Sequence, residues 1–275
     1  HSRGGIIVTT PADRAVRTAR SIESTTKAQA FELRAAEIVA WTELLATLGP
    51  DDWSRPTPCS LWDVKDIVGH LCGHAEEDLR PWLFPLRDRR AARRHPQMSY
   101  IDAHMQVQVE EHRGMTPAQV HERFVRVWPR ANRRLRRVPG IVRRLRVPTG
   151  LTQPSKVSIA YLHDVIHARD LWMHRDDLCR AIGTEFAPGP HTPDVVEQVL
   201  RDLDEHWPGP TVILELTGAA DGAWQLGVGA PVATVRADAV SYMRALAGRD
   251  SDPAAQVVTG DPSAAPLVTA ARVLF

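Results

Sequence analysis

The sequence predicts an α+β protein in which a four-helix bundle is followed by a small C-terminal domain of helices and strands. Two observations support this prediction. Apolar residues recur at helical spacing over long stretches of residues 26–187. After Pro188 the composition shifts, and short runs rich in β-branched residues flank a turn at residues 220–222. We therefore expect an N-terminal tail over residues 1–25, the bundle over 26–187 and the small α+β domain over 188–275.

The first two bundle helices are separated by a proline-rich loop. Residues 27–48 are rich in Ala, Glu and Leu, and their apolar positions follow helical spacing. Ser60 is a suitable N-cap for a second helix over residues 61–79. The apolar face of this second helix includes His70, so a titratable side chain is expected to point into the bundle.

Further helices are expected over residues 99–112 and 117–135, the latter with a proline at its first helical position. The last bundle helix is expected over residues 156–181, with Ser155 as its cap and Gly183 as its stop. Four main helices joined by loops favour an antiparallel bundle.

The C-terminal domain is expected to alternate helices with short strands. Its strand-like runs are residues 211–217, 224–228 and 234–235, and its helices are expected over 192–206, 238–246 and 262–271.

Overall composition excludes several function classes. The chain carries 34 Lys and Arg against 33 Asp and Glu, which gives no general attraction to nucleic acid or to an anionic membrane. No apolar run approaches the roughly 20 residues that a membrane-spanning helix needs. Cys59, Cys72 and Cys179 form no CxxC pair and are expected to be small buried residues. We therefore expect a cytoplasmic protein with no nucleic-acid or membrane partner.

One helical face gathers four potential metal ligands, namely His163, His167, Asp170 and His174. At about 100° per residue they fall within a stripe roughly 60° wide. Side chains at i and i+4 can chelate one ion, so either Asp170 with His174 or His163 with His167 could supply two ligands. His70 is the natural third ligand.

Each of these residues taken alone also fits a side chain that is hydrogen-bonded in the core. Four together make a metal site or an active-site cleft the better interpretation, because every buried polar atom needs a partner. His74 and Asp78 continue the face of His70 by helical turns and are second-choice ligands.

Several segments resemble the mycothiol-dependent maleylpyruvate isomerase family, a branch of the DinB-like helical bundles. Trp53 with residues 56–71, and residues 169–183, resemble the ligand-bearing parts of the family's metal-binding module. Gly222-Ala223-Trp224, Ala247-Gly248-Arg249 and Thr259-Gly260-Asp261 resemble its sterol-carrier-protein-like C-terminal domain. The resemblance covers most of the chain.

The resemblance implies a divalent metal, with zinc as the preferred candidate, held by His70, Asp170 and His174. The family's middle ligand is often Glu or His, so Asp170 departs from the pattern and His167 is the alternative. Three protein ligands leave a fourth position open, as in catalytic zinc sites. A thiol bound there is expected to be a thiolate.

The implied activity is that of an enzyme that uses mycothiol as its thiol cosubstrate. Its thiolate would add to a small electrophilic, maleylpyruvate-like substrate that bears a carboxylate, leading to isomerisation or to S-transfer. Arg249 is the candidate catalytic residue, weighed evenly against a role in capping its helix or pairing with Asp250 or Asp252. The alternative function is a non-catalytic metal-binding regulatory or sensor module. The oligomeric state is expected to be a monomer or a homodimer.

Arginines cluster at residues 130–146, which hold eight of them, and again at residues 89–94. Guanidinium groups suit the recognition of carboxylate or phosphate. A solvated basic face is the preferred interpretation for most of these side chains.

Overall fold

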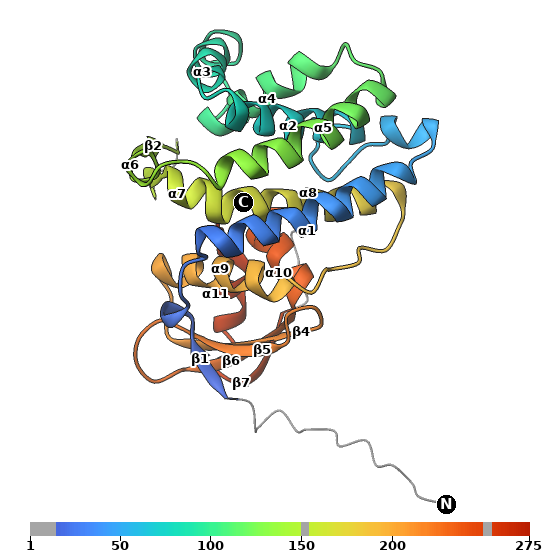
Figure 1. Cartoon of the computed structure of the whole chain (residues 1–275). Helices are drawn as coiled ribbons and strands as arrows, with labels where there is room; N and C mark the ends of the chain where they lie inside the picture. The colour runs from blue at the N-terminus through green and yellow to red at the C-terminus, as the bar shows by residue number, and fades with distance from the viewer. Residues whose placement is uncertain (1–14, 150–153, 250–254) are drawn as a thin grey trace, which may run out of the picture. The chain divides into compact units, whose positions relative to one another are not determined.

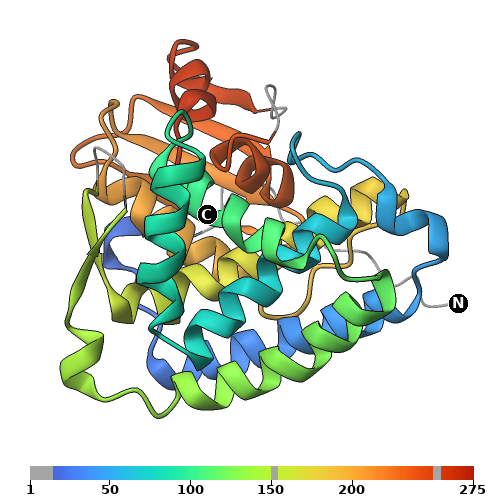
Figure 2. The same ribbon diagram turned by 90° about the horizontal axis from the view of Figure 1, so that it is seen from above.

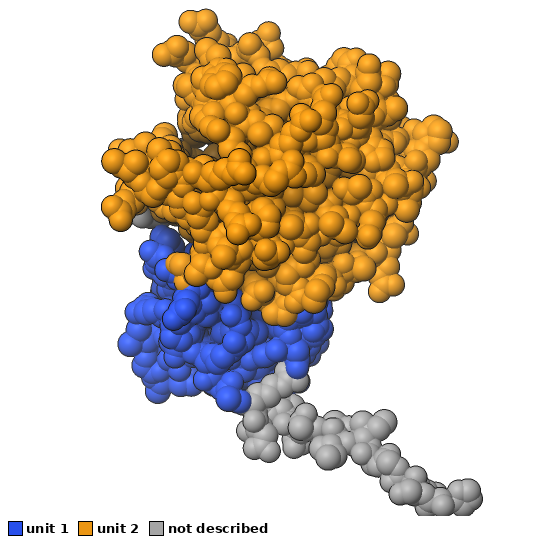
Figure 3. All heavy atoms as spheres, viewed as in Figure 1, with its two compact units in different colours: residues 1–23, 196–273 blue, residues 24–195, 274–275 orange. Residues whose placement is uncertain are grey.

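The computed structural model describes residues 15–149, 154–249 and 255–275. The chain divides into two compact units, shown in different colours in Figure 3: unit 1 comprises residues 1–23 and 196–273, and unit 2 comprises residues 24–195 and 274–275. Helices and a mixed sheet together confirm the predicted α+β class. Among the described residues, no helix combines the length and the apolar character that crossing a membrane requires.

Unit 2 is built on four helices: α1 (Lys27–Ala46), α2 (Val64–Leu79), α5 (Pro117–Leu135) and α8 (His167–Ile182). Helices α1 and α5 lie side by side, as both Figure 1 and Figure 2 show. This arrangement is the predicted four-helix bundle.

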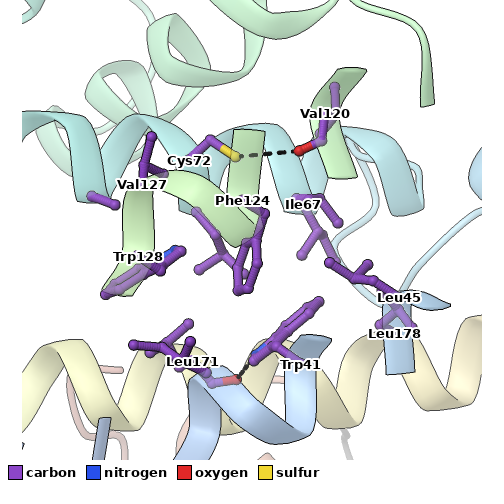
Figure 4. Close-up of a cluster of buried hydrophobic side chains, with 14 of the residues drawn as sticks. Trp41, Leu45, Ile67, Cys72, Val120, Phe124, Val127, Trp128, Leu171 and Leu178 are labelled. Atoms are coloured by element: carbon purple, nitrogen blue, oxygen red, sulfur yellow. Dashed lines mark hydrogen bonds between the residues drawn. The ribbon is translucent and has the colours of Figure 1, made fainter. Parts of the chain in front are cut away.

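The bundle core is formed by large apolar side chains from all four helices. Trp41 of α1, Phe124 of α5 and Leu171 of α8 are fully buried and lie in one cluster with residues of α2 (Figure 4). The indole Nε1 of Trp41 donates to the carbonyl oxygen of Leu171 at 2.9 Å, so the polar atom of this buried ring is satisfied. The core therefore fixes α8 against α1.

Helix ends follow local capping chemistry. Thr26 begins α1 with a capping box completed by Gln29, and Thr116 begins α5 in the same way. The N-cap of α2 is Asp63, which accepts from the backbone N of Asp66 at 2.7 Å. The predicted cap at Ser60 is therefore wrong, because the carboxylate three residues later satisfies the free backbone donor.

Two further helices pack beside α2. α4 (Tyr100–His112) lies close to the predicted range, whereas α3 (Leu83–Arg94) was not predicted. α4 approaches α2 at Gly73, where an added Cβ would come within 2.6 Å of Gln108 Cβ. A glycine is needed at this contact because any larger residue would separate the two helices.

The predicted helix over residues 156–181 is correct only in its second part. β3 (Lys156–Ser158) pairs antiparallel with β2 (Arg146–Pro148), which follows the short helix α6 (Gly140–Arg143). The short helix α7 (Ile159–Tyr161), a π-helical turn (Leu162–Ile166) and α8 then follow without a break. Strand pairing satisfies the backbone of residues 156–158, so the helix begins after them.

Unit 1 contains a five-stranded sheet in the order β1-β5-β4-β6-β7. Its strands are β1 (Val16–Thr18), β4 (Val212–Thr217), β5 (Gly222–Leu226), β6 (Ala233–Asp238) and β7 (Gln256–Gly260). β4 alternates buried and partly exposed residues, as a strand with one covered face does. Helices α9 (Thr192–Glu205), α10 (Ala239–Leu246) and α11 (Ala264–Ala270) also lie in this part of the chain (Figure 1). The border between the two units falls within α9.

The first strand differs from the expected N-terminal tail. Val16 pairs in parallel with Ala223 of β5, so β1 forms an edge of the sheet. A three-residue strand followed by a short 3-10 helix carries too little periodicity to be recognised from sequence alone.

Candidate metal centre

Two facing helices each present a pair of ligand-type side chains one turn apart. His70 and His74 lie at positions i and i+4 of α2, and Asp170 and His174 lie at the same spacing on α8. His70, Asp170 and His174 are buried, with 2%, 7% and 4% exposure. Helical periodicity therefore aims both pairs into the same interior space.

The three imidazole rings converge on the carboxylate of Asp170. Its Oδ2 lies 3.5 Å from His70 Nε2 and 3.3 Å from His74 Nδ1, and its Oδ1 lies 3.3 Å from His174 Nε2. The rings of His70 and His174 have centroids 5.3 Å apart. The structure thus brings together all three ligands predicted from the sequence. It adds His74, which the sequence indicates only as a second-choice ligand.

A glutamine sets the orientation of His70. Gln108 Nε2 donates to Glu77 Oε1 at 2.9 Å, which leaves its Oε1 facing His70 Nδ1 at 2.8 Å. Because the amide oxygen only accepts, Nδ1 carries the proton and the opposite nitrogen, Nε2, is the atom with a lone pair. That Nε2 is buried and has no hydrogen-bond partner among the described residues.

An aspartate orients His174 in a similar way. Asp177 Oδ2 lies 3.1 Å from His174 Nδ1 and, as a carboxylate oxygen, accepts its proton. His174 Nε2 is then directed at Asp170. A carboxylate behind the ring of a ligating histidine is a common outer partner in zinc sites. Cys59 Sγ lies 3.6 Å from the same Asp177 oxygen, so this thiol belongs to the surroundings of the cluster.

The electrostatics of the cluster favour a cation. Burial alone would raise the pKa of Asp170, but His174, His70 and His74 hold that pKa well below its usual range. Burial would likewise lower the pKa of His174, yet the Asp170 and Asp177 carboxylates raise it well above its usual value. Burial lowers the pKa of His70, so His70 is neutral at neutral pH.

The donor atoms of the cluster are of the kinds that bind zinc. Imidazole nitrogens and a carboxylate oxygen are ligands that Zn²⁺ accepts. One donor atom from each of His70, His74 and Asp170 lies within 4.8 Å of the others. The unpaired Nε2 of His70 is the observation that fits best, because its lone pair has no other partner to bind.

His167, the second-choice ligand, is directed elsewhere. Its Nε2 lies 3.0 Å from Asp78 Oδ1 and its Nδ1 lies 2.5 Å from the carbonyl oxygen of Leu162. His163 Nε2 is 3.8 Å from the same Asp78 oxygen. The predicted stripe of four ligands therefore divides. Asp170 lies with His70 and His74, and His174 contacts Asp170 while also lying close to Cys59 and Asp177. His163 and His167 form a separate cluster with Asp78.

A cavity of about 770 Å³ opens beside this second cluster. His74, Asp78, His163 and His167 line one part of it, and apolar side chains such as Phe84, Leu135 and Ile159 line another. Arg134, whose guanidinium contacts the backbone of Asp78, lines it together with Arg130, Arg133 and Arg137. Among the described residues, none of Arg130, Arg133 and Arg137 has a carboxylate partner within ion-pair distance. Part of the arginine-rich segment therefore borders a cavity, while these three side chains remain exposed, as the sequence interpretation of a solvated basic face expects.

Arg249, the candidate catalytic residue, lies in unit 1. Its guanidinium donates to the carbonyl oxygen of Ala247 at 3.2 Å, just after the end of α10. This contact agrees with the helix-capping alternative, and the catalytic role stays a prediction. The alternative partners Asp250 and Asp252 lie outside the described residues.

Sequence reasoning missed the groups that orient the ligands. Asp177 could have been found, because it follows His174 by three residues on the same helix. Gln108 gave no such signal, since its position depends on how α4 packs against α2. Cys59 was considered a buried residue, and its proximity to Asp177 depends on the loop before α2.

Two family models match the chain. Residues 34–179 match the mycothiol maleylpyruvate isomerase N-terminal domain, and residues 190–267 match the C-terminal domain of the same group. A search of the curated proteins finds no match.

Two solved structures share the fold. One is a mycothiol-dependent maleylpyruvate isomerase with 15% sequence identity and a TM-score of 0.59. The other is a point mutant of a mycothiol-dependent maleylpyruvate isomerase, with 13% identity and a TM-score of 0.56. Each comparison covers 90% of this chain and 97% of the other.

Proposed function

Because the chain belongs to the mycothiol maleylpyruvate isomerase family, as its sequence predicted, we propose that it is a metal-dependent enzyme that uses mycothiol to isomerise a small electrophilic substrate bearing a carboxylate. The observation that carries this proposal is the convergence of His70, His74 and His174 on the buried Asp170. Such a set of donors is costly to bury unless it serves a bound ion or a reaction.

The cluster residues would hold the metal, and two neighbouring side chains orient the histidines. His70, Asp170 and His174 would be the ligands, with His74 as a further donor beside Asp170. Gln108 keeps the proton of His70 on Nδ1, so the Nε2 of His70 remains available, and Asp177 orients His174 by accepting from its Nδ1. A bound divalent cation supplies one chemical function here, which is to lower the pKa of a thiol and so favour the thiolate.

The proposed reaction is reversible thiol addition. The thiolate sulfur forms a bond to one carbon of a conjugated cis double bond, and the electron pair of that double bond moves onto the conjugated carbonyl. Rotation about the resulting single bond follows. Elimination then breaks the carbon–sulfur bond, restores the double bond as trans and returns the thiolate. In S-transfer the adduct would instead take up a proton and keep the sulfur.

The cavity supports a carboxylate-bearing substrate. Arg130, Arg133 and Arg137 line it without a carboxylate partner among the described residues, and apolar side chains form much of the remaining wall. Its volume lies within the range of about 300–1,000 Å³ that is usual for small-molecule sites. Guanidinium groups would pair with the substrate carboxylate and fix its orientation.

The central test is metal content together with turnover. We expect the purified protein to contain stoichiometric divalent metal and to convert maleylpyruvate in the presence of mycothiol, with the product identified by chromatography. The change His174→Ala should remove most of the metal and the activity. His206→Ala is the matched control, because His206 is exposed and lies in unit 1. A protein without stoichiometric metal, in which His174→Ala leaves turnover unchanged, would contradict the proposal.

The second candidate function is a metal-binding regulatory or sensor module. It predicts that the wild-type protein binds metal through the same residues but converts none of the thiol and electrophile pairs tested. Product analysis also separates isomerisation from S-transfer, since isomerisation returns free mycothiol and S-transfer consumes one thiol for each product.

The role of the arginines that line the cavity can be tested separately. Changing Arg133 and Arg137 together to Ala should raise KM about 10- to 100-fold, because the loss of one hydrogen bond to a charged group costs roughly 1.5–3 kcal/mol, and should alter kcat much less. Arg136→Ala is the control, since Arg136 is directed over the ring of Phe31 and does not line the cavity. Equal KM values in the double variant and the wild type would show that these two arginines do not bind the substrate.

A further inference from the structure

A second cluster of ligand-type residues lies beside the Asp170 centre. Asp78 comes from the last turn of α2, His163 lies within the π-helical turn over residues 162–166, and His167 is the first residue of α8. One donor atom from each lies within 4.8 Å of the others. Two histidines at i and i+4 facing a carboxylate from another helix form a spacing that can chelate a metal.

The hydrogen bonds of His167 direct its Nε2 at the carboxylate of Asp78. Its Nδ1 lies 2.5 Å from the carbonyl oxygen of Leu162, and a carbonyl can only accept, so Nδ1 carries the proton. The Nε2 atom then directs its lone pair at Asp78 Oδ1, 3.0 Å away. Two electron-rich atoms face each other at this distance only when a proton or a metal ion lies between them.

Two further atoms of the cluster are left without partners. Asp78 Oδ2 and His163 Nδ1 are buried and have no hydrogen bond among the described residues. His163 Nε2 is 3.8 Å from Asp78 Oδ1, which is too long for a hydrogen bond. Asp78 is only 9% exposed, so a carboxylate with a free oxygen carries the full cost of its desolvation unless something else binds it.

The surroundings leave the carboxylate of Asp78 available. Arg143, a nearby cation, is ion-paired with Asp164, and the side chain of Arg34 donates to the carbonyl of His163 and to Asn132. Arg134 contacts only the backbone carbonyl of Asp78. Among the described residues, no arginine forms an ion pair with this carboxylate.

We propose that Asp78, His163 and His167 hold a second divalent cation of the zinc type, next to the Asp170 centre. The rings of His74 and His167 have centroids 4.1 Å apart and connect the two clusters. Asp78, His163 and His167 also line the large cavity, so the second ion has open coordination positions facing it. π-helical turns are frequent at functional sites, and this one contains His163 and ends directly before His167.

The ligand of this second ion would be an oxygen donor in the cavity, such as the substrate carboxylate. This role rests on the proposed function, whereas the metal stoichiometry does not. The two can therefore fail separately.

The test counts metal ions in the full-length protein after zinc loading and removal of excess metal. We expect two equivalents in the wild type and one in His167→Ala, His163→Ala and His70→Ala. The double variant His70→Ala with His167→Ala should hold none, and His206→Ala should hold two. Cobalt substitution gives a second readout, because each site adds its own visible absorption band.

Two results would overturn the proposal. One is a wild type that holds a single ion, lost in His70→Ala and retained in His167→Ala. The other is a second ion that persists unchanged in both His163→Ala and His167→Ala. If an alanine variant fails to fold, His163→Gln and His167→Gln serve instead, since they keep the side-chain bulk while replacing the imidazole.

Discussion

Single residues around the candidate metal centre differ in how far the sequence reveals them. His70, Asp170 and His174 could be predicted, because helical periodicity places each on an inward face and the family resemblance singles them out. Gln108 could not, because its contact with His70 spans two helices, and their close approach at Gly73 depends on tertiary packing. Periodicity shows which face of a helix is inward, but it does not show which neighbour that face meets.

Gln108 provides a test at this scale. Changing Gln108 to Leu removes the acceptor for His70 Nδ1, so the ring loses its fixed proton position. We expect the affinity for zinc to fall about 10- to 100-fold, as is usual when the outer partner of a ligating histidine is lost. Competition with a chelator measures this affinity for zinc. Gln119→Ala is the control, because Gln119 only caps α5; equal affinities in all three proteins would show that Gln108 does not support the metal.

At the scale of elements, the predicted helix over residues 156–181 shows where periodicity fails. Residues 156–158 pair with β2, and the π-helical turn over residues 162–166 shifts the helical phase before α8. A uniform rotation of about 100° per residue places His163 and His167 on the same helical face as His174, whereas in the structure both side chains are directed at Asp78. Strand pairing and a π turn both depend on distant partners, which a local pattern does not contain.

The contact between α2 and α4 leads to a prediction for glycine. In Gly73→Ala the new Cβ would meet Gln108 Cβ at 2.6 Å, so the helices must separate. We expect a loss of roughly 1–3 kcal/mol in the free energy of unfolding, as for other overpacked contacts, together with weaker zinc binding because Gln108 moves. Urea denaturation measures the first effect. Gly114→Ala should change neither, since an added Cβ there has open space.

At the scale of the whole bundle, one buried carboxylate ties four helices together. Glu76 of α2 is ion-paired with Arg87 of α3 and Arg123 of α5, and His112 of α4 lies 3.5 Å from it. Burial would raise the pKa of Glu76, but His112 and Arg123 lower it to about 2, from an ordinary value of 4.5. The sequence marked these residues only as charged positions on separate helices.

This network sets the acid stability of unit 2. Because the pKa of Glu76 is lower in the folded state, its stabilising contribution is complete above pH 4.5 and is lost as pH falls towards 2. We expect the free energy of unfolding, measured by urea denaturation, to decline over that interval. In Glu76→Gln this part of the decline should disappear, while Glu122→Gln, at an exposed site on α5, should retain it. Parallel pH curves for the wild type and Glu76→Gln would contradict the assignment.

The edge strand of unit 1 has a consequence for how the chain is made. Val16 pairs with Ala223, a residue about 200 positions later. At the usual rate of about 5–20 residues per second, a ribosome needs roughly 10–40 s to produce the partner of β1. Unit 2 emerges in the meantime, because nearly all of it is encoded between the two parts of unit 1. In a nascent chain, nearly all of unit 2 is therefore synthesised before β5, the strand with which β1 pairs.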